Sequence, residues 1–272
     1  MQELYKYRHF CKSHIDSLIK NQLWFSTGST FNDPFDCSTN FPITWASGGS
    51  LVEFIIHNTD FAMDLIRSGM SYSQITDAIM NSVAQLMDKP DVFNDSAAKH
   101  LRYILFGRMC RALILCLSKN VKNNLMWSHY SNWHTGFCIG FNHEKLIQSL
   151  DPYHHADVNY DSKPYDIMKN IDAMRNDKLQ PAKQLCFMKS PEWSYECEYR
   201  IILDTLAKEE KQSTPIVYAQ ECVESIYFGM NAKDSDIKSL QANLIGRNIK
   251  FFKIHPDPSG LTYDLVVKPI LE

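Results

Sequence analysis

WSYECEYRII, residues 193–202, combines two acidic side chains with aromatic and β-branched residues, a composition typical of a strand. Glu196 and Glu198 stand two positions apart, and on a strand this spacing places both side chains on one face. The opposite face would then carry Tyr195, Cys197 and Tyr199. Charged side chains in the middle of a strand destabilise it unless they form ion pairs, are exposed to solvent or bind a ligand or substrate. The two glutamates are therefore either solvent-facing partners of Arg200 or of a nearby lysine, or functional residues.

The composition of the chain indicates a folded globular protein. Its 272 residues are 44% hydrophobic, which is enough for one large core or two modest domains. The formal net charge of −3 and the pI near 6.4 exclude a globally basic nucleic-acid binder. Binding of a nucleic acid would therefore need a local basic patch.

The cysteines and the N-terminal residues bear on the cellular compartment. Eight cysteines are scattered along the sequence without a C-x-x-C pair, and most have apolar neighbours. This pattern predicts buried, reduced thiols in a cytosolic protein. The first ten residues, MQELYKYRHF, lack the apolar segment of a signal peptide, and no apolar run is long enough to span a membrane. We expect a cytoplasmic protein without a membrane partner.

The periodicity of apolar residues predicts an α+β fold. Strand patterns alternate with helical ones along the sequence, and a mainly helical pattern runs from about residue 51 to about residue 111. We interpret the latter as a helical insertion that packs on one side of a sheet. Since no repeat, low-complexity tract or linker divides the sequence, we predict a single α+β domain over residues 1–272 with this insertion.

Four clusters mix polar and aromatic residues where the chain otherwise resembles a packed core. They are residues 5–9, residues 25–27 together with 31–36, residues 126–130, and residues 193–200. Each also has a structural interpretation. Arg8 could stack between tyrosines without a ligand, the Asn32-Asp33-Pro34 segment could form a turn, and His129 could be a buried histidine with satisfied hydrogen bonds.

The spacing of candidate ligands and the presence of known motifs indicate whether the chain binds a metal or belongs to one of several enzyme classes. His129 and His134 have no further ligand at zinc-motif spacing, and His154 and His155 are adjacent, so we do not predict a structural zinc. A magnesium site of nuclease type remains open as an alternative, and its ligands would be Asp33, Asp36, Glu196 and Glu198. The sequence contains no G-x-S-x-G, P-loop or G-x-G-x-x-G motif, which argues against serine hydrolases, P-loop NTPases and Rossmann dehydrogenases.

A series of motifs resembles the bacterial domain-of-unknown-function family 2971, members of which occur in phage-defence neighbourhoods. The motifs are LYKYR, LWFSTGSTFNDPFDC, LCLSKN, LMWSHYSNWHTGFCIGF, KSPEWSYECEYRI and VESIYFGMNA. The F-N-D-P-F-D and W-x-Y-E-x-E-Y-R blocks are the most specific of them. The family label supplies no activity.

A second resemblance suggests an activity. An arginine on the first strand, an aromatic-Ser-Thr strand after the first helix and a late E-x-E strand are similar to ADP-ribosyltransferases of the toxin and tRNA-modifying kinds. This resemblance implies a central, mostly antiparallel sheet and NAD as the substrate. It also implies that Arg8 contacts the NAD phosphates, that Ser26 with Thr27 supports the nicotinamide ribose, and that Glu198 binds a ribose hydroxyl. Glu196 would take the place of the upstream acid of the E-x-E pair.

The remaining candidate site residues come from the polar-aromatic clusters. We expect Tyr7, Phe25 or Trp127 to stack on nicotinamide and to exclude water. Further binding candidates are Asn32, Asp33 and Tyr130, and His129 joins the two glutamates as a catalytic candidate.

The sequence thus predicts an NAD-dependent ADP-ribosyltransferase-like enzyme that acts as a toxin or phage-defence effector and modifies a protein or nucleic-acid acceptor. The alternatives are a magnesium-dependent nuclease and a non-enzymatic sensor or interaction module. Convergence of Arg8, Ser26, His129 and Glu198 on one cleft would favour an enzyme.

Overall fold

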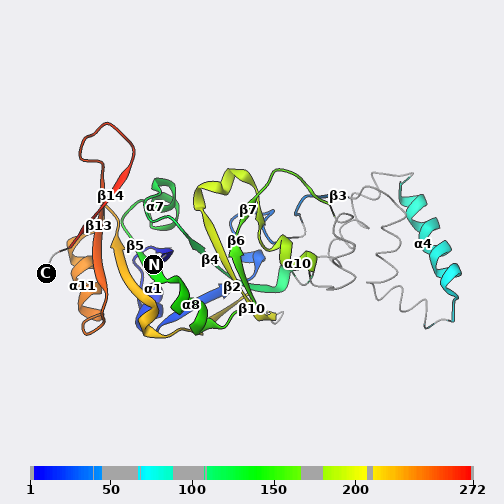
Figure 1. Cartoon of the computed structure of the whole chain (residues 1–272), viewed down its shortest axis with the longest axis horizontal. Helices are drawn as coiled ribbons and strands as arrows, with labels where there is room; N and C mark the ends of the chain where they lie inside the picture. Colours follow the sequence, from blue (N-terminus) through cyan, green and yellow to red (C-terminus); the bar gives the residue numbers. More distant parts are fainter. Residues whose placement is uncertain are drawn as a thin grey trace. The chain divides into compact units, whose positions relative to one another are not determined.

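A computed structural model describes residues 3–38, 40–44, 67, 69–87, 107, 109–166, 180–206 and 211–270 (Figure 1). The chain divides into two compact units. The first unit comprises residues 1–26, 113–160 and 189–272, and the second comprises residues 27–112 and 161–188. The chain therefore leaves the first unit twice and returns to it twice.

The described strands and helices follow one another along the chain in this order, beginning with the elements before residue 130: β1 Glu3–Arg8, α1 Lys12–Ile19, β2 Gln22–Ser26, the 3-10 helix η1 Gly28–Thr30, β3 Ile43–Thr44, α4 Tyr72–Met87, β4 Ala112–Ser118 and α7 Asn124–Tyr130. The middle of the chain contains β5 Phe137–Asn142, α8 His143–Leu150, β6 His154–Asp157, β7 Asn159–Tyr160, β8 Tyr165–Asp166, α10 Gln180–Leu185, β9 Met188–Lys189 and the 3-10 helix η4 Pro191–Glu196. The last elements are β10 Glu198–Leu206, β11 Ser213–Val217, the 3-10 helix η5 Gln220–Cys222, β12 Val223–Phe228, α11 Asp234–Asn243, β13 Lys250–Pro256 and β14 Leu265–Pro269.

The described residues of the first unit build one large sheet of ten strands. Its main path runs β11-β2-β4-β1-β5-β12-β13-β14, and β10 joins it by pairing with β4 and with β6. Most pairs are antiparallel, whereas β12 and β13 are parallel. A parallel pair needs a crossover connection, and α11 provides it. The predicted α+β class with a mostly antiparallel sheet is confirmed.

β5 lies between β1 and β12 in the interior of this sheet. All six residues of its sequence FCIGFN are buried, as expected for a strand that is covered on both faces. It pairs with β1 from Glu3↔Asn142 to Arg8↔Phe137, and with β12 on its other edge. Gly140 is required here, since a Cβ atom at this position would collide with the side chains of Ser225 and Glu3. The strand ends where Asn142 caps α8 by accepting a hydrogen bond from the Lys145 amide at 3.0 Å.

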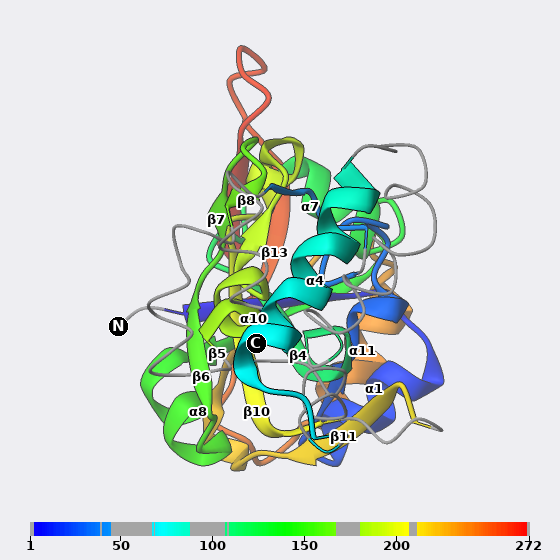
Figure 2. The same ribbon diagram turned by 90° about the vertical axis from the view of Figure 1, so that its right-hand side faces the viewer.

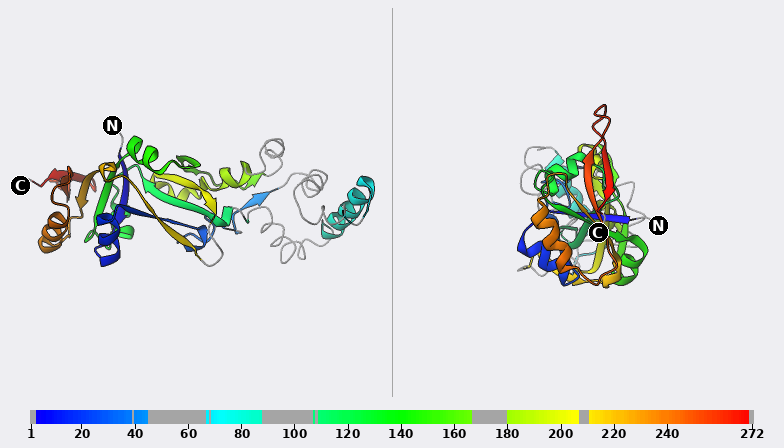
Figure 3. Two further views of the ribbon diagram at one scale, coloured as in Figure 1. Left: turned by 90° about the horizontal axis from the view of Figure 1, so that it is seen from below. Right: turned by 90° about the vertical axis from the view of Figure 1, so that its left-hand side faces the viewer.

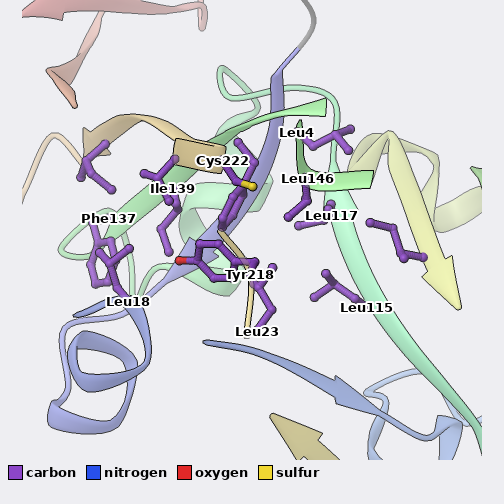
Figure 4. Packing of buried hydrophobic residues seen from close by; sticks show 14 of the residues in the cluster. Leu4, Leu18, Leu23, Leu115, Leu117, Phe137, Ile139, Leu146, Tyr218 and Cys222 are labelled. Atoms are coloured by element: carbon purple, nitrogen blue, oxygen red, sulfur yellow. The ribbon is translucent and has the colours of Figure 1, made fainter. Parts of the chain in front are cut away.

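The main hydrophobic core fills one face of the sheet (Figure 4). Leu4, Leu115 and Phe137 contribute to it from strands, and Leu18 and Leu146 from α1 and α8. Figure 2 and Figure 3 show further views of this arrangement, in which the Arg247 guanidinium, in the segment after α11, donates hydrogen bonds to the Leu18 and Ile19 carbonyls of α1. A second buried cluster contains Tyr7, Trp127 and Tyr227.

The second unit is described only in part. Within it, β3 and β8 form a parallel two-stranded pair, Ile43↔Tyr165 and Thr44↔Asp166. Much of the predicted helical insertion at about 51–111 lies outside the described residues, and α4 is its main described element. The single domain with this insertion therefore stays a prediction.

The predicted strand over residues 193–202 is wrong in its first half. Pro191 stands at the start of a 3-10 helix that runs to Glu196, and Cys197 adopts a left-handed conformation with φ 44° before β10 begins at Glu198. Proline suits the first turn of a helix because its φ is preset and its missing amide proton is not needed there. Glu196 and Glu198 consequently belong to two elements and do not share a strand face.

Two further expectations concern membranes and thiols. In the ranges that the structure describes, no helix combines the length and the apolar character needed to cross a membrane. All eight cysteines lie in described ranges and are free, and four of them, Cys37, Cys138, Cys186 and Cys222, are buried.

Candidate functional site

The sheet of the first unit splits beside β4. β4 pairs with three strands, β1, β2 and β10. Since a strand has only two edges, two of these partners must share one edge. β1 pairs with β4 at Tyr5↔Ser118 and β2 pairs with it at Ser26↔Ile114, so Cys116 lies between the two pairings. The Lys6 ammonium donates a hydrogen bond of 2.6 Å to the Cys116 carbonyl at this point.

A pocket of about 470 Å³ opens where β1 and β2 diverge, and we call it the β1–β2 pocket. Its walls come from β1, from β2 and from the helix α1 that connects them. The lining residues are Lys6, Arg8, Ser13, His14, Asp16, Ser17, Lys20, Gln22, Trp24 and Ser26. The strand residues among them are spaced by two because alternate side chains point to one face.

The β1–β2 pocket is electropositive. The half-buried Arg8 guanidinium has no hydrogen-bond or ion-pair partner among the residues that the structure describes. Burial lowers the pKa of Arg8 to about 10. Burial, together with the neighbouring Arg8 charge, lowers the pKa of Lys6 to about 8. Two cations held close together without a full set of partners form a site that attracts an anion.

A buried ionic cluster lies next to the β1–β2 pocket, and we define it as Lys189, Glu196, Glu198 and Arg200. The Lys189 Nζ lies 2.6 Å from Glu196 Oε2 and 3.2 Å from Glu198 Oε2. The Arg200 Nε and Nη2 atoms donate to the two oxygens of Glu198 at 2.8 and 3.0 Å. Each of the four side chains is at most 5% exposed. Two cations and two carboxylates are therefore in direct contact in the protein interior.

The two carboxylates differ in electrostatic environment. Burial alone would raise the pKa of Glu198, but the Arg200 and Lys189 charges lower that pKa to about 2. Burial raises the pKa of Glu196, opposed by Lys189, and Tyr130 donates a hydrogen bond of 2.5 Å to its Oε1. Glu198 is thus a permanent carboxylate, held by four hydrogen-bonding contacts from cations and from the Cys116 thiol.

Cys116 and Lys6 connect the pocket with the ionic cluster. The Cys116 carbonyl accepts from Lys6, and its thiol hydrogen-bonds to the Glu198 carboxylate. The charges of Glu198 and Glu196 in turn raise the pKa of Lys6 against the lowering effect of burial. A ligand in the β1–β2 pocket would therefore act on the cluster through Lys6.

The structure brings only some of the predicted site residues together. Arg8 and Ser26 line the same pocket. Glu196, Glu198 and Tyr130 meet in or beside the ionic cluster instead. His129 is exposed on α7, with its ring 6.1 Å from that of Tyr195, so the interpretation as a buried histidine is wrong.

Tyr7 and Trp127 pack in the second hydrophobic cluster. Their rings meet edge to face at 5.1 Å, the Tyr7 hydroxyl donates to the Asn120 carbonyl, and the Trp127 indole donates to the Val121 carbonyl. Trp127 has no exposed surface. Either ring would have to leave this packing to stack on a ligand, so their predicted role as binding residues stays a prediction. Phe25 is likewise fully buried, in the main core.

Thr27, Asn32 and Asp33 belong to the second unit. The Thr27 hydroxyl contacts the Ser29 hydroxyl at 2.8 Å. The Asp33 carboxylate accepts a hydrogen bond of 2.9 Å from the Phe35 amide. This contact supports the interpretation of the Asn32-Asp33-Pro34 segment as a turn in which an acidic side chain caps the backbone.

Sequence reasoning missed Lys6, Trp24 and Lys189. Trp24 lines the pocket between Gln22 and Ser26, and the spacing of two along β2 could have identified it. The sequence pattern does not identify Lys189, because its partners Glu196 and Glu198 lie in two different elements, η4 and β10, whose fold was not predicted. The sequence analysis also did not identify the group formed by His9, Cys11 and His14. In the described part of the chain, this is the one set of three metal-ligating side chains whose ligand atoms all lie within 4.8 Å of one another.

The fold and the site together define a mixed α+β protein with a basic pocket beside a buried ionic cluster. Residues 126–201 match the model of a family described as "Protein of unknown function (DUF2971)", which confirms the family resemblance over this part of the chain. The matched segment contains Tyr130 and all four members of the ionic cluster. No curated protein matches the chain, and no solved structure does.

Proposed function

We propose that this protein is an ADP-ribosyltransferase-like enzyme that uses NAD as its substrate and binds the NAD pyrophosphate in the β1–β2 pocket. One observation carries the proposal. Arg8 and Ser26, the residues that the resemblance assigns to the phosphates and to the ribose of NAD, line one pocket, and the Arg8 guanidinium has no partner within the described residues.

The chemistry of the β1–β2 pocket suits a pyrophosphate. A guanidinium presents a planar fork of donors that matches phosphate oxygens, and an ammonium such as that of Lys20 adds charge. The Ser13 hydroxyl, which contacts the Cys11 sulfur at 3.1 Å, is a further polar group that α1 contributes to the lining. The volume of about 470 Å³ lies within the range of small-molecule sites.

Trp24 is the aromatic ring best placed to stack on a nucleotide. It lines the β1–β2 pocket, it is 43% exposed, and its indole donates a hydrogen bond of 3.1 Å to the Ser17 hydroxyl. That bond restrains the ring, whose face can then pack on nicotinamide or adenine. Trp24 thus takes the stacking role for which the sequence nominated Tyr7, Phe25 and Trp127.

In the proposed reaction the bond between the ribose C1′ and the nicotinamide nitrogen breaks, and nicotinamide leaves with the electron pair. A nucleophile of the acceptor forms the new bond to C1′ and releases its proton. The positive charge that develops on the ribose is stabilised by a carboxylate, and Glu198 is the ionised candidate. Glu198 reaches the ribose only if it exchanges a contact with Lys189 or Arg200 for one with the ribose hydroxyl.

Purified protein incubated with labelled NAD and a cell extract tests the proposal. Release of nicotinamide and transfer of label to protein or nucleic acid are expected, and Arg8→Gln should reduce both by at least about 10-fold because it removes the phosphate fork. Arg8 is preferable to Glu198 for this test, since Glu198→Gln would remove a buried carboxylate charge that both Arg200 and Lys189 contact. Lys238→Gln, an exposed change on α11, is the matched control.

Calorimetry with NAD, ADP and inorganic pyrophosphate separates binding from chemistry. All three should bind the wild type and bind Arg8→Gln more weakly. Absence of NAD binding and of nicotinamide release would refute the proposal. Degradation of RNA or DNA that EDTA abolishes and NAD does not affect would favour the nuclease alternative, and binding without turnover would favour the sensor alternative. A toxin or defence effector should also deplete NAD in cells that express it.

A further inference from the structure

The junction between β1 and α1 gathers three side chains with metal-ligating atoms. His9, Cys11 and His14 each offer one such atom, and these atoms all lie within 4.8 Å of one another. His9 is exposed, and Cys11 and His14 are half-buried, so an ion can reach all three from solvent. The two imidazole rings meet edge to face with centroids 4.4 Å apart.

The backbone of the junction already orients one ligand. The His14 Nδ1 atom lies 3.0 Å from the His9 carbonyl, and this acceptor requires Nδ1 to carry the proton. The Nε2 atom of His14 then keeps its lone pair. A carbonyl that receives the second ring N–H is the usual outer partner of a metal-binding histidine, because it fixes both the tautomer and the ring orientation.

We propose that His9, Cys11 and His14 form a zinc-binding site with two imidazole nitrogens and one thiolate as ligands, leaving the fourth tetrahedral position to water or to a bound anion. The donor set supports this choice of metal. Thiolate and imidazole ligands suit zinc, whereas magnesium and calcium require oxygen ligands, which this group lacks.

Zinc binding needs only small side-chain movements. Ligand atoms around a tetrahedral zinc ion are about 3.5 Å apart, so the present arrangement has to contract by roughly an ångström. The exposed His9 ring can rotate, and the Cys11 sulfur has to exchange its contact with the Ser13 hydroxyl at 3.1 Å for the metal. The thiol loses its proton to solvent as the zinc–sulfur bond forms.

The site adjoins the β1–β2 pocket through one shared residue. His14 belongs both to the metal-binding group and to the pocket lining. A bound zinc ion would add positive charge to the edge of a pocket that already contains Lys6 and Arg8. The inference does not rest on the proposed function, because zinc binding is measured without NAD.

Titration of the purified full-length protein with zinc, in competition with a chromophoric chelator and under reducing conditions, is the direct test. We expect a stoichiometry of about one zinc ion per chain, because the three ligands form a single site. Cobalt substitution should give visible d–d bands of a tetrahedral ion and a near-ultraviolet thiolate-to-cobalt charge-transfer band. Cys11→Ser should abolish the charge-transfer band, and His14→Gln should weaken zinc binding by at least about 10-fold.

Two control variants identify the site. Cys197→Ser and His255→Gln remove a thiol and an imidazole elsewhere in the first unit and should leave the affinity and the cobalt spectrum unchanged. Circular dichroism establishes that each variant is folded. The proposal is overturned if the wild type binds no stoichiometric zinc, if Cys11→Ser retains the charge-transfer band, or if the controls lose metal as strongly as the ligand variants.

Discussion

At the scale of single residues, Glu198 and Arg200 depend on each other. Arg200 has no exposed surface and donates to both oxygens of Glu198. Removing one partner of a buried ion pair leaves an uncompensated charge in the interior, which typically costs about 3–5 kcal/mol. Glu198→Gln should therefore lower the free energy of unfolding by about that amount, as measured by urea denaturation near neutral pH.

Glu224→Gln supplies the matched control for this prediction. Glu224 accepts from Lys145 at 3.3 Å in a partly exposed pair of the same unit. Exposed pairs contribute less than about 1 kcal/mol because water and salt screen them. If the two variants lose equal stability, the ionic cluster does not have the energetic role that its burial indicates.

Lys6 gives a prediction about pH. Burial and the Arg8 charge lower its pKa from the ordinary 10.5 to about 8 in the folded protein. Between these two values the unfolded chain binds more protons than the folded one, so this group stabilises the fold progressively as the pH rises. The stability of the wild type relative to Lys6→Met should therefore increase by about 1–3 kcal/mol between pH 7.5 and pH 10.

The comparison with Lys6→Met is needed because other groups titrate in the same range. Burial raises the pKa of the Cys116, Cys138 and Cys222 thiols, so alkaline pH destabilises both proteins through these groups. The effect of Cys222 cancels in the difference between the two urea series, whereas the Lys6 charge also lowers the pKa of Cys116 and Cys138, so Cys116→Ala and Cys138→Ala backgrounds remove their contribution. A difference that is constant over the pH range would show that Lys6 keeps its ordinary pKa in the fold.

At the scale of elements, Cys197 forms the joint between η4 and β10. Its φ of 44° lies in the left-handed region, which a β-branched side chain disfavours. Cys197→Val should unfold at lower urea concentration than Cys197→Ala, with a free-energy difference of about 1–2 kcal/mol. Cys197→Gly should be at least as stable as the alanine variant, since glycine adopts this conformation without strain.

A reversed order, with valine the most stable of the three, would mean that residues 193–202 continue as one strand in solution. Amide hydrogen exchange distinguishes the two arrangements. In the structure the Lys119 amide donates to the Cys197 carbonyl at 2.9 Å, and the Glu198 amide donates to the Tyr160 hydroxyl at 2.8 Å. Both amides should exchange slowly if the joint is present.

The sequence allowed much of this organisation of elements to be predicted. The sequence predicted a first strand that carries Arg8, a helix after it and an aromatic-Ser-Thr strand, and the structure has β1, α1 and β2 in that order. The same reasoning placed residues 193–202 on one strand because a spacing of two also fits W-S-Y-E, and it gave Pro191 no weight as a helix start.

The site was less predictable than the fold because its parts come from distant segments. Arg8 and Ser26 were identified by type and order along the chain, and the split of the sheet beside β4 brings them to one pocket. Local patterns contain no information on a strand with three neighbours. Lys189 was missed for the same reason, since its salt bridges depend on how η4 folds back toward β10.

At the scale of the whole molecule, every feature with proposed chemistry lies in the first unit. The β1–β2 pocket, the ionic cluster and the metal-binding group all use residues of segments 1–26, 113–160 and 189–272. Ser26 and Ile114 are directly paired across β2 and β4, so a short turn can join them. Tyr160 and Lys189 both contact Glu198, so their ends are close as well.

A shortened chain follows from this geometry. Replacement of residues 27–112 by a turn and of residues 161–188 by a short glycine-serine segment should leave a protein that unfolds cooperatively and retains zinc and pyrophosphate affinity within about 10-fold of the full chain. Thermal denaturation and calorimetry provide the measurements. A shortened chain that collapses without a cooperative transition would show that the second unit is required for the first to fold.

The burial of the ionic cluster also affects how the sequence can diverge. Two cations and two carboxylates are confined where water cannot compensate for a lost partner. A lineage that replaces one member alone passes through an unstable intermediate, whereas a paired exchange of a cation and its carboxylate for apolar residues of similar volume does not. Positions 189, 196, 198 and 200 should consequently vary together or not at all among sequences that share this cluster.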